Sequence, residues 1–190
     1  MSATNAPFGM RPAFHPSGLD RAQALANGIV SAYSSDILKG QPVKYVTGGT
    51  IEVAAAGDRF AGAFAGVEWT DTTGRRRVSN YWPANTAFQT GSCVAYFYND
   101  PLIVYEIQAD GSLTQASVGD QADLSNTTAG SSTTGLSQAT LSTTLAGAGA
   151  SAQMRIVDLA PYPDNAWGDA FTFVRVSINE SQFNASVLAV

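Results

Sequence analysis

Residues 93–108 constrain the fold more than any other part of this chain. Two runs rich in β-branched and aromatic residues, 93–98 and 102–108, flank the turn-forming tripeptide Asn99-Asp100-Pro101. This pattern predicts a β-hairpin. Successive side chains of a strand point to opposite faces, and here both faces are largely apolar, whereas a sheet with one side in water is apolar on one face only. We therefore expect both sides to be covered, by a second sheet, the chain's own arms or another subunit.

Further short runs of strand-like composition follow from residue 29 onward. The predicted strands cover residues 29–35, 42–45, 50–54, 61–70, 75–82, 113–118, 121–124, 153–159 and 171–179. Helical periodicity is nearly absent, and only residues 20–27, rich in alanine and followed by Gly28, predict a short helix. About ten closely spaced strands predict an all-β fold, in the first place a jelly-roll-like sandwich and in the second a β-barrel.

The first 28 residues differ from the rest of the chain. Proline and glycine interrupt any regular element there, whereas Phe8, Met10, Phe14 and Leu19 are too apolar for a free tail. We predict an extended N-terminal arm over residues 1–28 and a single β domain over residues 29–190. The arm is expected to lie in a groove of another molecule, which is our preferred interpretation, or in a groove of its own domain.

Residues 125–152 have an unusual composition. All but five of them are Ser, Thr, Ala or Gly, and no charged residue occurs between Asp123 and Arg155. Such a segment is typical of a disordered linker. Leu136, Leu141 and Leu145 would also suit a flat strand or a loop that lies on a partner, and we expect at least partial order.

The charged fraction of the chain, 13%, is about half the share usual in globular proteins. A weakly charged surface suits a protein that is packed against other proteins, and a weakly charged monomer is the alternative. The net charge of −5 argues against binding to nucleic acid, which requires clustered cations.

The only basic run comprises Arg75, Arg76 and Arg77. On a strand, Arg75 and Arg77 share one face and Arg76 points the other way. The run either meets carboxylates on a partner or protects a solvated edge strand from aggregation.

The sequence shows no sign of export or of membrane insertion. The N-terminus lacks a basic region followed by an apolar run, and no stretch approaches the ~18 apolar residues of a membrane span. We expect synthesis and folding in a host cytoplasm, with no membrane partner. The single cysteine, Cys93, lies in a strand pattern and is expected to be a buried small hydrophobe.

Few groups are available for catalysis. His15 is the only histidine and has no nearby carboxylate before Asp20, and no nucleophile elbow occurs, so a Ser-His-Asp triad is not expected. One cysteine and one histidine are too few for a zinc site, and no phosphate-binding glycine motif is present. We predict no enzymatic activity, no catalytic residue, no cofactor and no metal.

Carboxylates and tryptophans leave weaker alternatives open. Glycoside hydrolysis needs two carboxylates, which the glutamates Glu52, Glu68, Glu106 and Glu180 offer, although solvent-exposed glutamate is routine in β proteins. Sugar stacking is open to Trp69, Trp82 and Trp167. Calcium binding is open to Asp120 and Asp123, or to Asp158, Asp164 and Asp169, but none matches an EF-hand, and turn-forming roles are expected instead.

Several segments, taken in order, resemble small structural proteins of tailed bacteriophages, the capsid decoration or cement proteins. The segments are residues 8–12, 37–43, 64–67, 71–75, 81–83, 99–101, 106–111, 154–157 and 176–180, and together they extend over nearly the whole chain. The resemblance implies a β-rich, often jelly-roll-like protein on the outside of an icosahedral head, which bridges neighbouring major capsid subunits, commonly as a dimer or trimer.

The expected localisation is therefore the capsid surface of a virion, and the expected partners are the major capsid protein and further copies of the chain. A receptor-binding or glycan-binding jelly roll of a fibre or tail is the alternative function. No residue is carried over from the family as a known contact. From the arm and the basic run themselves, the candidate capsid or subunit contacts are Phe8, Met10, Arg11, Phe14, Arg75 and Arg77.

Overall fold

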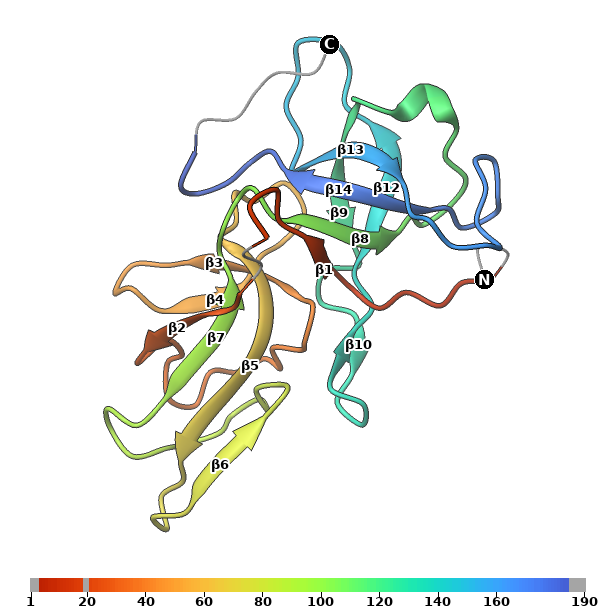
Figure 1. Cartoon of the computed structure of the whole chain (residues 1–190). Helices are drawn as coiled ribbons and strands as arrows, with labels where there is room; N and C mark the ends of the chain where they lie inside the picture. The colour runs from red at the N-terminus through yellow and green to blue at the C-terminus, as the bar shows by residue number, and fades with distance from the viewer. Residues whose placement is uncertain (1–3, 19–20, 185–190) are drawn as a thin grey trace.

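The computed structural model describes residues 4–18 and 21–184, and over these residues the all-β prediction is confirmed. Two six-stranded antiparallel sheets form a sandwich-like arrangement, and a two-stranded sheet lies beside them (Figure 1). The only helical element in the described ranges is a short 3-10 turn, η1 (Gln115–Ser117). None of the described helices is long and apolar enough to cross a membrane.

The first sheet, called sheet A, has the strand order β1-β8-β14-β13-β9-β12. All of its strands except β1 come from the C-terminal half of the chain. Its strands are β1 (Arg11–Phe14), β8 (Val104–Gln108), β9 (Gln121–Ser125), β12 (Thr140–Leu145), β13 (Met154–Leu159) and β14 (Phe173–Ile178). Alternation separates the two faces of β14, because Val174, Val176 and Ile178 enter the core while Phe173 and Arg175 face outward.

The second sheet, called sheet B, has the order β2-β7-β5-β3-β4, with β6 also paired to β5. Its strands are β2 (Gln23–Ala26), β3 (Pro42–Tyr45), β4 (Ile51–Val53), β5 (Gly62–Thr70), β6 (Arg76–Ser79) and β7 (Val94–Tyr98). The small third sheet pairs β10 (Gly130–Ser131) with β11 (Leu136–Ser137). Each large sheet has its own apolar cluster, and Ala54, Phe60 and Ala63 extend the cluster of sheet A toward sheet B.

The predicted hairpin over residues 93–108 is wrong in its pairing, although both strands exist. β7 belongs to sheet B and β8 to sheet A, so the two strands do not pair with each other. The connection between them carries the chain from one sheet to the other, and the arm supplies the partner on one side of each, β2 for β7 and β1 for β8. Asn99-Asp100-Pro101 therefore forms a crossover between sheets and not a hairpin turn.

Three local predictions are also corrected. The helix expected at residues 20–27 is an extended segment containing β2, because its backbone bonds to β7; Leu19 and Asp20 lie outside the described residues. Residues 29–35 form turns in which Ala32 has a φ of 59°, and only Ile29 is buried like a strand residue. Residues 113–118 contain η1, closed by the Ser117 amide on the Thr114 carbonyl, in place of a strand.

The Ser/Thr/Ala/Gly-rich segment forms strands of the domain. It contains β10, β11 and β12, and β12 pairs with β9 at the edge of sheet A. Leu141 is fully buried, whereas Leu136 on β11 is 41% exposed. The leucines therefore have different roles, one in the core and one at the surface.

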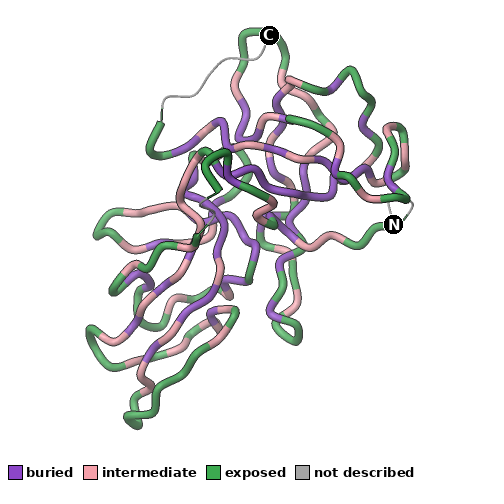
Figure 2. Tube along the Cα trace, in the orientation of Figure 1, coloured by how far each residue is buried: buried purple, intermediate pink, exposed green. Residues whose placement is uncertain are grey.

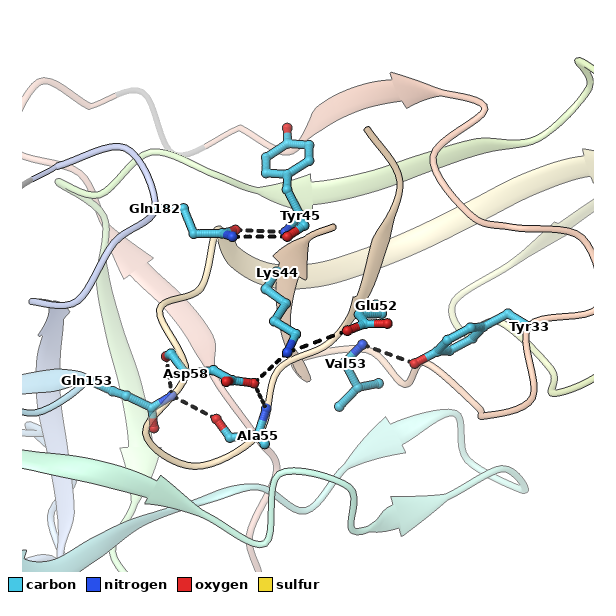
Figure 3. Close-up of polar contacts among 9 residues, drawn as sticks. All are labelled: Tyr33, Lys44, Tyr45, Glu52, Val53, Ala55, Asp58, Gln153 and Gln182. Carbon is cyan, nitrogen blue, oxygen red and sulfur yellow. Dashed lines mark hydrogen bonds and ion pairs between the residues drawn. The ribbon is translucent and has the colours of Figure 1, made fainter. Parts of the chain in front are cut away.

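Polar contacts fasten the two sheets to each other (Figure 3). The Gln153 side-chain amide donates to the carbonyls of Ala55 and Asp58 at 2.9 and 2.7 Å. Gln182 holds the backbone of Tyr45 with two hydrogen bonds of 2.7 and 3.0 Å. The Lys44 ammonium lies 2.8 Å from the Asp58 carboxylate. This ion pair stabilises the loop whose carbonyls accept from Gln153.

Candidate functional site

Charged side chains cross the outer face of sheet A in a single row. Arg11 on β1 is opposite Glu106 on β8, Glu106 is opposite Arg175 on β14, and Arg175 is opposite Asp158 on β13. Directly opposed side chains on neighbouring strands lie close enough to interact. These four residues, of alternating charge, are called the charge row.

Glu106 is the centre of the charge row and its side chain is only 10% exposed. Its Oε2 atom lies 2.6 Å from Nη2 of Arg11 and accepts a 2.5 Å hydrogen bond from the Tyr162 hydroxyl. Its Oε1 atom lies 3.6 Å from Nε of Arg175. Two arginines thus face one buried carboxylate, and Asp158 opposite Arg175 balances the charge of the row.

Three aromatic rings surround this charged centre: Phe8 from the arm, Tyr162 from the β13–β14 connection and Phe173 from β14. Phe8 stacks on Phe173 with ring centroids 5.6 Å apart and an interplanar angle of 7°. Tyr162 meets Phe173 edge-on at 5.8 Å, and the Arg11 guanidinium lies 4.7 Å from the centre of the Phe8 ring. Glu106 is buried beside these rings, whereas the Arg11 side chain remains 51% exposed.

A β-bulge determines which arm residues reach the outer face. The register of β1 against β8 shifts between Pro12 and Phe14, so Arg11 and Phe14, although three residues apart, both contact the charge row. Phe14 lies under the Arg175 guanidinium at 5.5 Å from its ring centre and is 42% exposed. Met10 points the other way and is 1% exposed, in the core of sheet A.

The arm is held farther upstream by Gln108, a residue with no exposed surface. The Gln108 side chain accepts from the amide of Ala6 at 2.9 Å and donates to the carbonyl of Thr4 at 2.8 Å. The outer face of β8, predicted to need a cover, is therefore covered by the chain's own arm. The preferred interpretation, an arm in the groove of another molecule, is not the arrangement seen for residues 4–14.

Two cavities flank the arm where it crosses sheet A. One, of about 330 Å³, is walled by Phe8, Met10, Arg11, Phe64, Tyr98 and Leu136 with Lys39 at its edge. The other, of about 350 Å³, lies between Phe8, Arg11, Tyr162 and Phe173. Phe8 and Arg11 line both depressions, whereas Gly9 and Met10 between them are buried.

The structure does not bring Arg75 and Arg77 to this site. They lie on the β5–β6 hairpin of sheet B, whose tip is exposed (green, at the bottom of Figure 2). Arg77 Nε is 3.0 Å from the Asp71 carboxylate, and Arg76 pairs with Glu68 on the opposite side. Of the six candidate contacts, Phe8, Arg11 and Phe14 therefore gather on sheet A, Met10 enters the core, and the arginines Arg75 and Arg77 stand apart.

His15 has a carboxylate partner that sequence reasoning missed. Its Nε2 atom lies 3.1 Å from Asp100, which is distant in sequence. Its Nδ1 atom receives the Ser17 amide at 3.0 Å and the Ser17 hydroxyl at 2.6 Å. Because an amide can only donate, Nδ1 is the acceptor and the proton of the neutral ring is on Nε2, which lies near Asp100 without hydrogen-bond geometry.

These three residues have the composition of a catalytic triad, but their contacts describe a turn. The Ser17 amide is bonded to Nδ1 and the Gly18 amide to the His15 carbonyl, so neither can stabilise an oxyanion. The group joins two crossovers between the sheets, the β1–β2 turn and the β7–β8 connection. Its role is to fix the position of the arm.

Most side chains that could stack on a sugar or act as a thiol nucleophile are buried in the core. Trp82 is fully buried and Trp69 is 8% exposed, in edge-on contact with each other at 5.4 Å, so neither can stack on a sugar. Trp167 is partly exposed and packs with its other side against the core of sheet A. Burial raises the pKa of the Cys93 thiol to about 11, as expected for an unreactive core cysteine.

The glutamates do not form a shared site. Glu52 faces Lys44, Glu68 faces Arg76, Glu106 faces Arg11, and Glu180 accepts from Ser151. Among the described residues, no group of three or more His, Cys, Asp or Glu side chains could hold a metal ion. Asp169 accepts from the Ala166 amide, which is a turn-forming role.

Buried glutamines are the structural residues that sequence reasoning did not identify. Gln41, Gln108 and Gln153 are each at most 1% exposed, and each bonds to backbone groups of a distant segment. An uncharged amide both donates and accepts, so it can satisfy a buried backbone without the desolvation cost of a charge. The low charged fraction of the chain was the sequence signal that uncharged side chains would make its buried polar contacts.

The comparisons with known proteins identify no relative. No family model, curated protein or solved structure matches this chain.

Proposed function

We propose that this chain is a structural virion protein that binds the outside of a phage capsid and stabilises it by bridging neighbouring major capsid subunits. The resemblance of its ordered segments to capsid decoration proteins is one support. The sparse charge of the chain and the burial of Trp69, Trp82 and Cys93 in the core, away from any substrate, are others. A surface of this kind suits permanent contact with other proteins.

The observation that carries the proposal is the exposed β5–β6 hairpin. Arg76, Arg77 and Val78 of β6 are all exposed, and Val78 retains 75% of its accessible surface. In a chain of net charge −5, this edge combines an apolar side chain with three consecutive arginines. It fits an acidic capsid surface that offers an apolar depression, whereas the arm residues Phe8, Met10 and Arg11 are engaged on their own sheet.

Bridging works through multivalency. Each contact buries apolar area at ~25 cal/mol per Å², less the ordering cost, so a single contact is weak. A protein that touches several capsid subunits at once turns weak contacts into high avidity. Addition of the protein is therefore expected to raise the melting temperature of expanded capsids.

The test is sedimentation of the purified protein with undecorated, expanded capsids of the phage that encodes it. The double variant Arg75→Ser/Arg77→Ser is expected to lose at least tenfold in affinity. The matched control is Arg21→Ser/Lys39→Ser, which removes the same charge from exposed positions outside the hairpin. Equal binding by the two variants would contradict the role of the hairpin, and absence of any binding by the wild-type chain would contradict the proposed function.

A further inference from the structure

The groove on the outer face of sheet A is built to hold an arm. Gln108 is fully buried only because Thr4 and Ala6 lie on it, and its two side-chain hydrogen bonds both go to arm backbone. Glu106 is 10% exposed and faces Arg11. If the arm left, an amide and a carboxylate would lose their partners and Met10 would leave the core. The groove is therefore stable only when an arm occupies it.

None of these contacts requires that the arm belong to the same copy of the chain. The anchoring residues of the arm lie within residues 4–14. Phe8 stacks on Phe173, Arg11 pairs with Glu106, and the Gln108 side chain bonds only to backbone atoms of the arm. An arm of identical sequence from a second copy would make every one of them. The arm of a second copy of this protein therefore fits this groove as well as the chain's own arm does.

The connection between residues 4–14 and β2 is short, and its described residues 15–18 form a turn. Residues 15–22 link β1 of sheet A to β2 of sheet B, and fully extended they span about 26 Å. The turn is closed by the Gly18 amide on the His15 carbonyl at 2.8 Å and by the contacts of His15 with Ser17 and Asp100. Opening this one turn releases the arm as a unit.

Open surface depressions of about 330 and 350 Å³ border the segment containing Phe8 and Arg11, whereas Gly9 and Met10 between them are closely packed.

We propose that the arm exchanges between copies, so that residues 4–14 of one molecule occupy the sheet A groove of another. The exchanged and unexchanged forms make the same anchoring contacts, and the balance between them depends on the opened turn and on local concentration. Exchange links the copies without any new interface. It also gives a physical route to the oligomer expected of a bridging protein. Arm exchange does not require a capsid, because it is a property of the isolated chain.

Cross-linking of two different single-cysteine chains tests the proposal directly. Cys93→Ala is the background for both, one chain carries Phe8→Cys and the other Phe173→Cys. The chains are mixed at high concentration, unfolded and refolded together, and treated with a short bifunctional maleimide. A two-chain band in the mixture, at least fivefold stronger than in either chain alone, is expected, because only an exchanged arm brings these two positions together.

The collision control replaces Phe8→Cys by Val78→Cys, which is exposed and lies on sheet B. A mixture that cross-links no more than this control overturns the proposal, provided that circular dichroism shows folded chains. Should either cysteine variant fail to fold, light scattering of the wild-type chain refolded over a hundredfold range of concentration decides the matter. A mass of 19.8 kDa at every concentration overturns arm exchange, and a concentration-dependent multiple supports it.

The outcome is independent of the capsid. Arm exchange in a chain that does not bind capsids would refute the proposed function alone. Capsid binding by a chain that never exchanges arms would refute the exchange alone.

Discussion

The charge row of sheet A and the β5–β6 hairpin of sheet B use the same chemistry in different surroundings. Each sets arginine against carboxylate across neighbouring strands, Arg11 with Glu106 in one and Arg77 with Asp71 in the other. In both pairs the arginine side chain is half exposed, 51% for Arg11 and 52% for Arg77, whereas the carboxylate is 10% exposed at Glu106 and 19% exposed at Asp71. Glu106 also faces Arg175 and accepts from the Tyr162 hydroxyl. The two regions therefore differ in the burial and the shared partners of the carboxylate, and not in the exposure of the arginine.

Removal of the central carboxylate is expected to have the largest effect. Glu106→Ala leaves Arg11 and Arg175 without their shared partner and removes the acceptor of the Tyr162 hydroxyl. Loss of one partner of a buried pair costs about 3–5 kcal/mol, and the half-exposed Arg11 places the loss near 3 kcal/mol. Chemical denaturation measures it.

The matched control is Glu68→Ala on the hairpin, which removes the partner of the largely exposed Arg76. Its midpoint of denaturation is expected to shift far less than that of Glu106→Ala. Equal shifts would show that the arm does not shield the charge row from water.

Two glycines sharpen the comparison at the level of the backbone. Gly9 in the arm and Gly74 in the hairpin turn both have positive φ, of 74° and 88°. A Cβ at Gly9 would lie 2.6 Å from the Gly40 carbonyl oxygen, whereas at Gly74 the nearest atom is 3.9 Å away. Gly74→Ala is expected to cost about 1 kcal/mol from backbone strain, and Gly9→Ala about 2 kcal/mol because a clash is added.

Thermal unfolding of both glycine variants checks this ordering. Proteolysis adds a second measurement, because Gly9→Ala is expected to expose the arm to cleavage several-fold faster while Gly74→Ala leaves the arm protected. If the two variants lose the same stability, the crowding around the arm has no energetic consequence.

The pH dependence of the hairpin is the smallest expected effect. The Arg76 guanidinium lowers the pKa of Glu68, and the Thr73 hydroxyl together with the Arg75 amide lowers that of Asp71. Carboxylates with lowered pKa values contribute stability that is complete above their unfolded pKa values near 4 and is lost as pH falls below them. Arg76→Ser is therefore expected to lower the melting temperature slightly at pH 6, and its difference from the wild-type chain is expected to shrink as the pH falls below about 4.

Salt provides the control for this last prediction. The effect of Arg76→Ser at pH 6 is expected to diminish in 1 M salt, because exposed pairs are screened. Arg11→Ser, whose partner Glu106 is buried, is expected to keep most of its effect at the same salt concentration. The reverse order would contradict the distinction drawn between the two regions.

Local patterns predicted the individual strands well and their partners poorly. Predicted ranges 42–45, 50–54, 61–70, 153–159 and 171–179 each contain a strand, because alternation and turn residues act within a few positions. The hairpin at residues 93–108 failed in its pairing, since sequence proximity favours neighbours and the arm strands competed successfully for both edges.

The candidate site was predictable in part. The apolar and cationic character of Phe8, Arg11 and Phe14 marked the arm as a segment that must be buried somewhere. That Glu106 would be their partner was not predictable, because its burial depends on Tyr162 from the β13–β14 connection and on Arg175 from β14. The same holds for His15, whose carboxylate partner Asp100 is brought close only by the two crossovers between sheets.

By itself the sequence determined that this chain is all-β, sparsely charged and equipped with an arm that needs a groove, because period-two alternation, composition and turn residues are local properties. Only the tertiary structure decided where the strands pair, which side chains the arm covers and that the groove is the chain's own. Those outcomes depend on competition between segments distant in sequence for the same edges and faces, and the energy that decides it exists only once both sheets are in place.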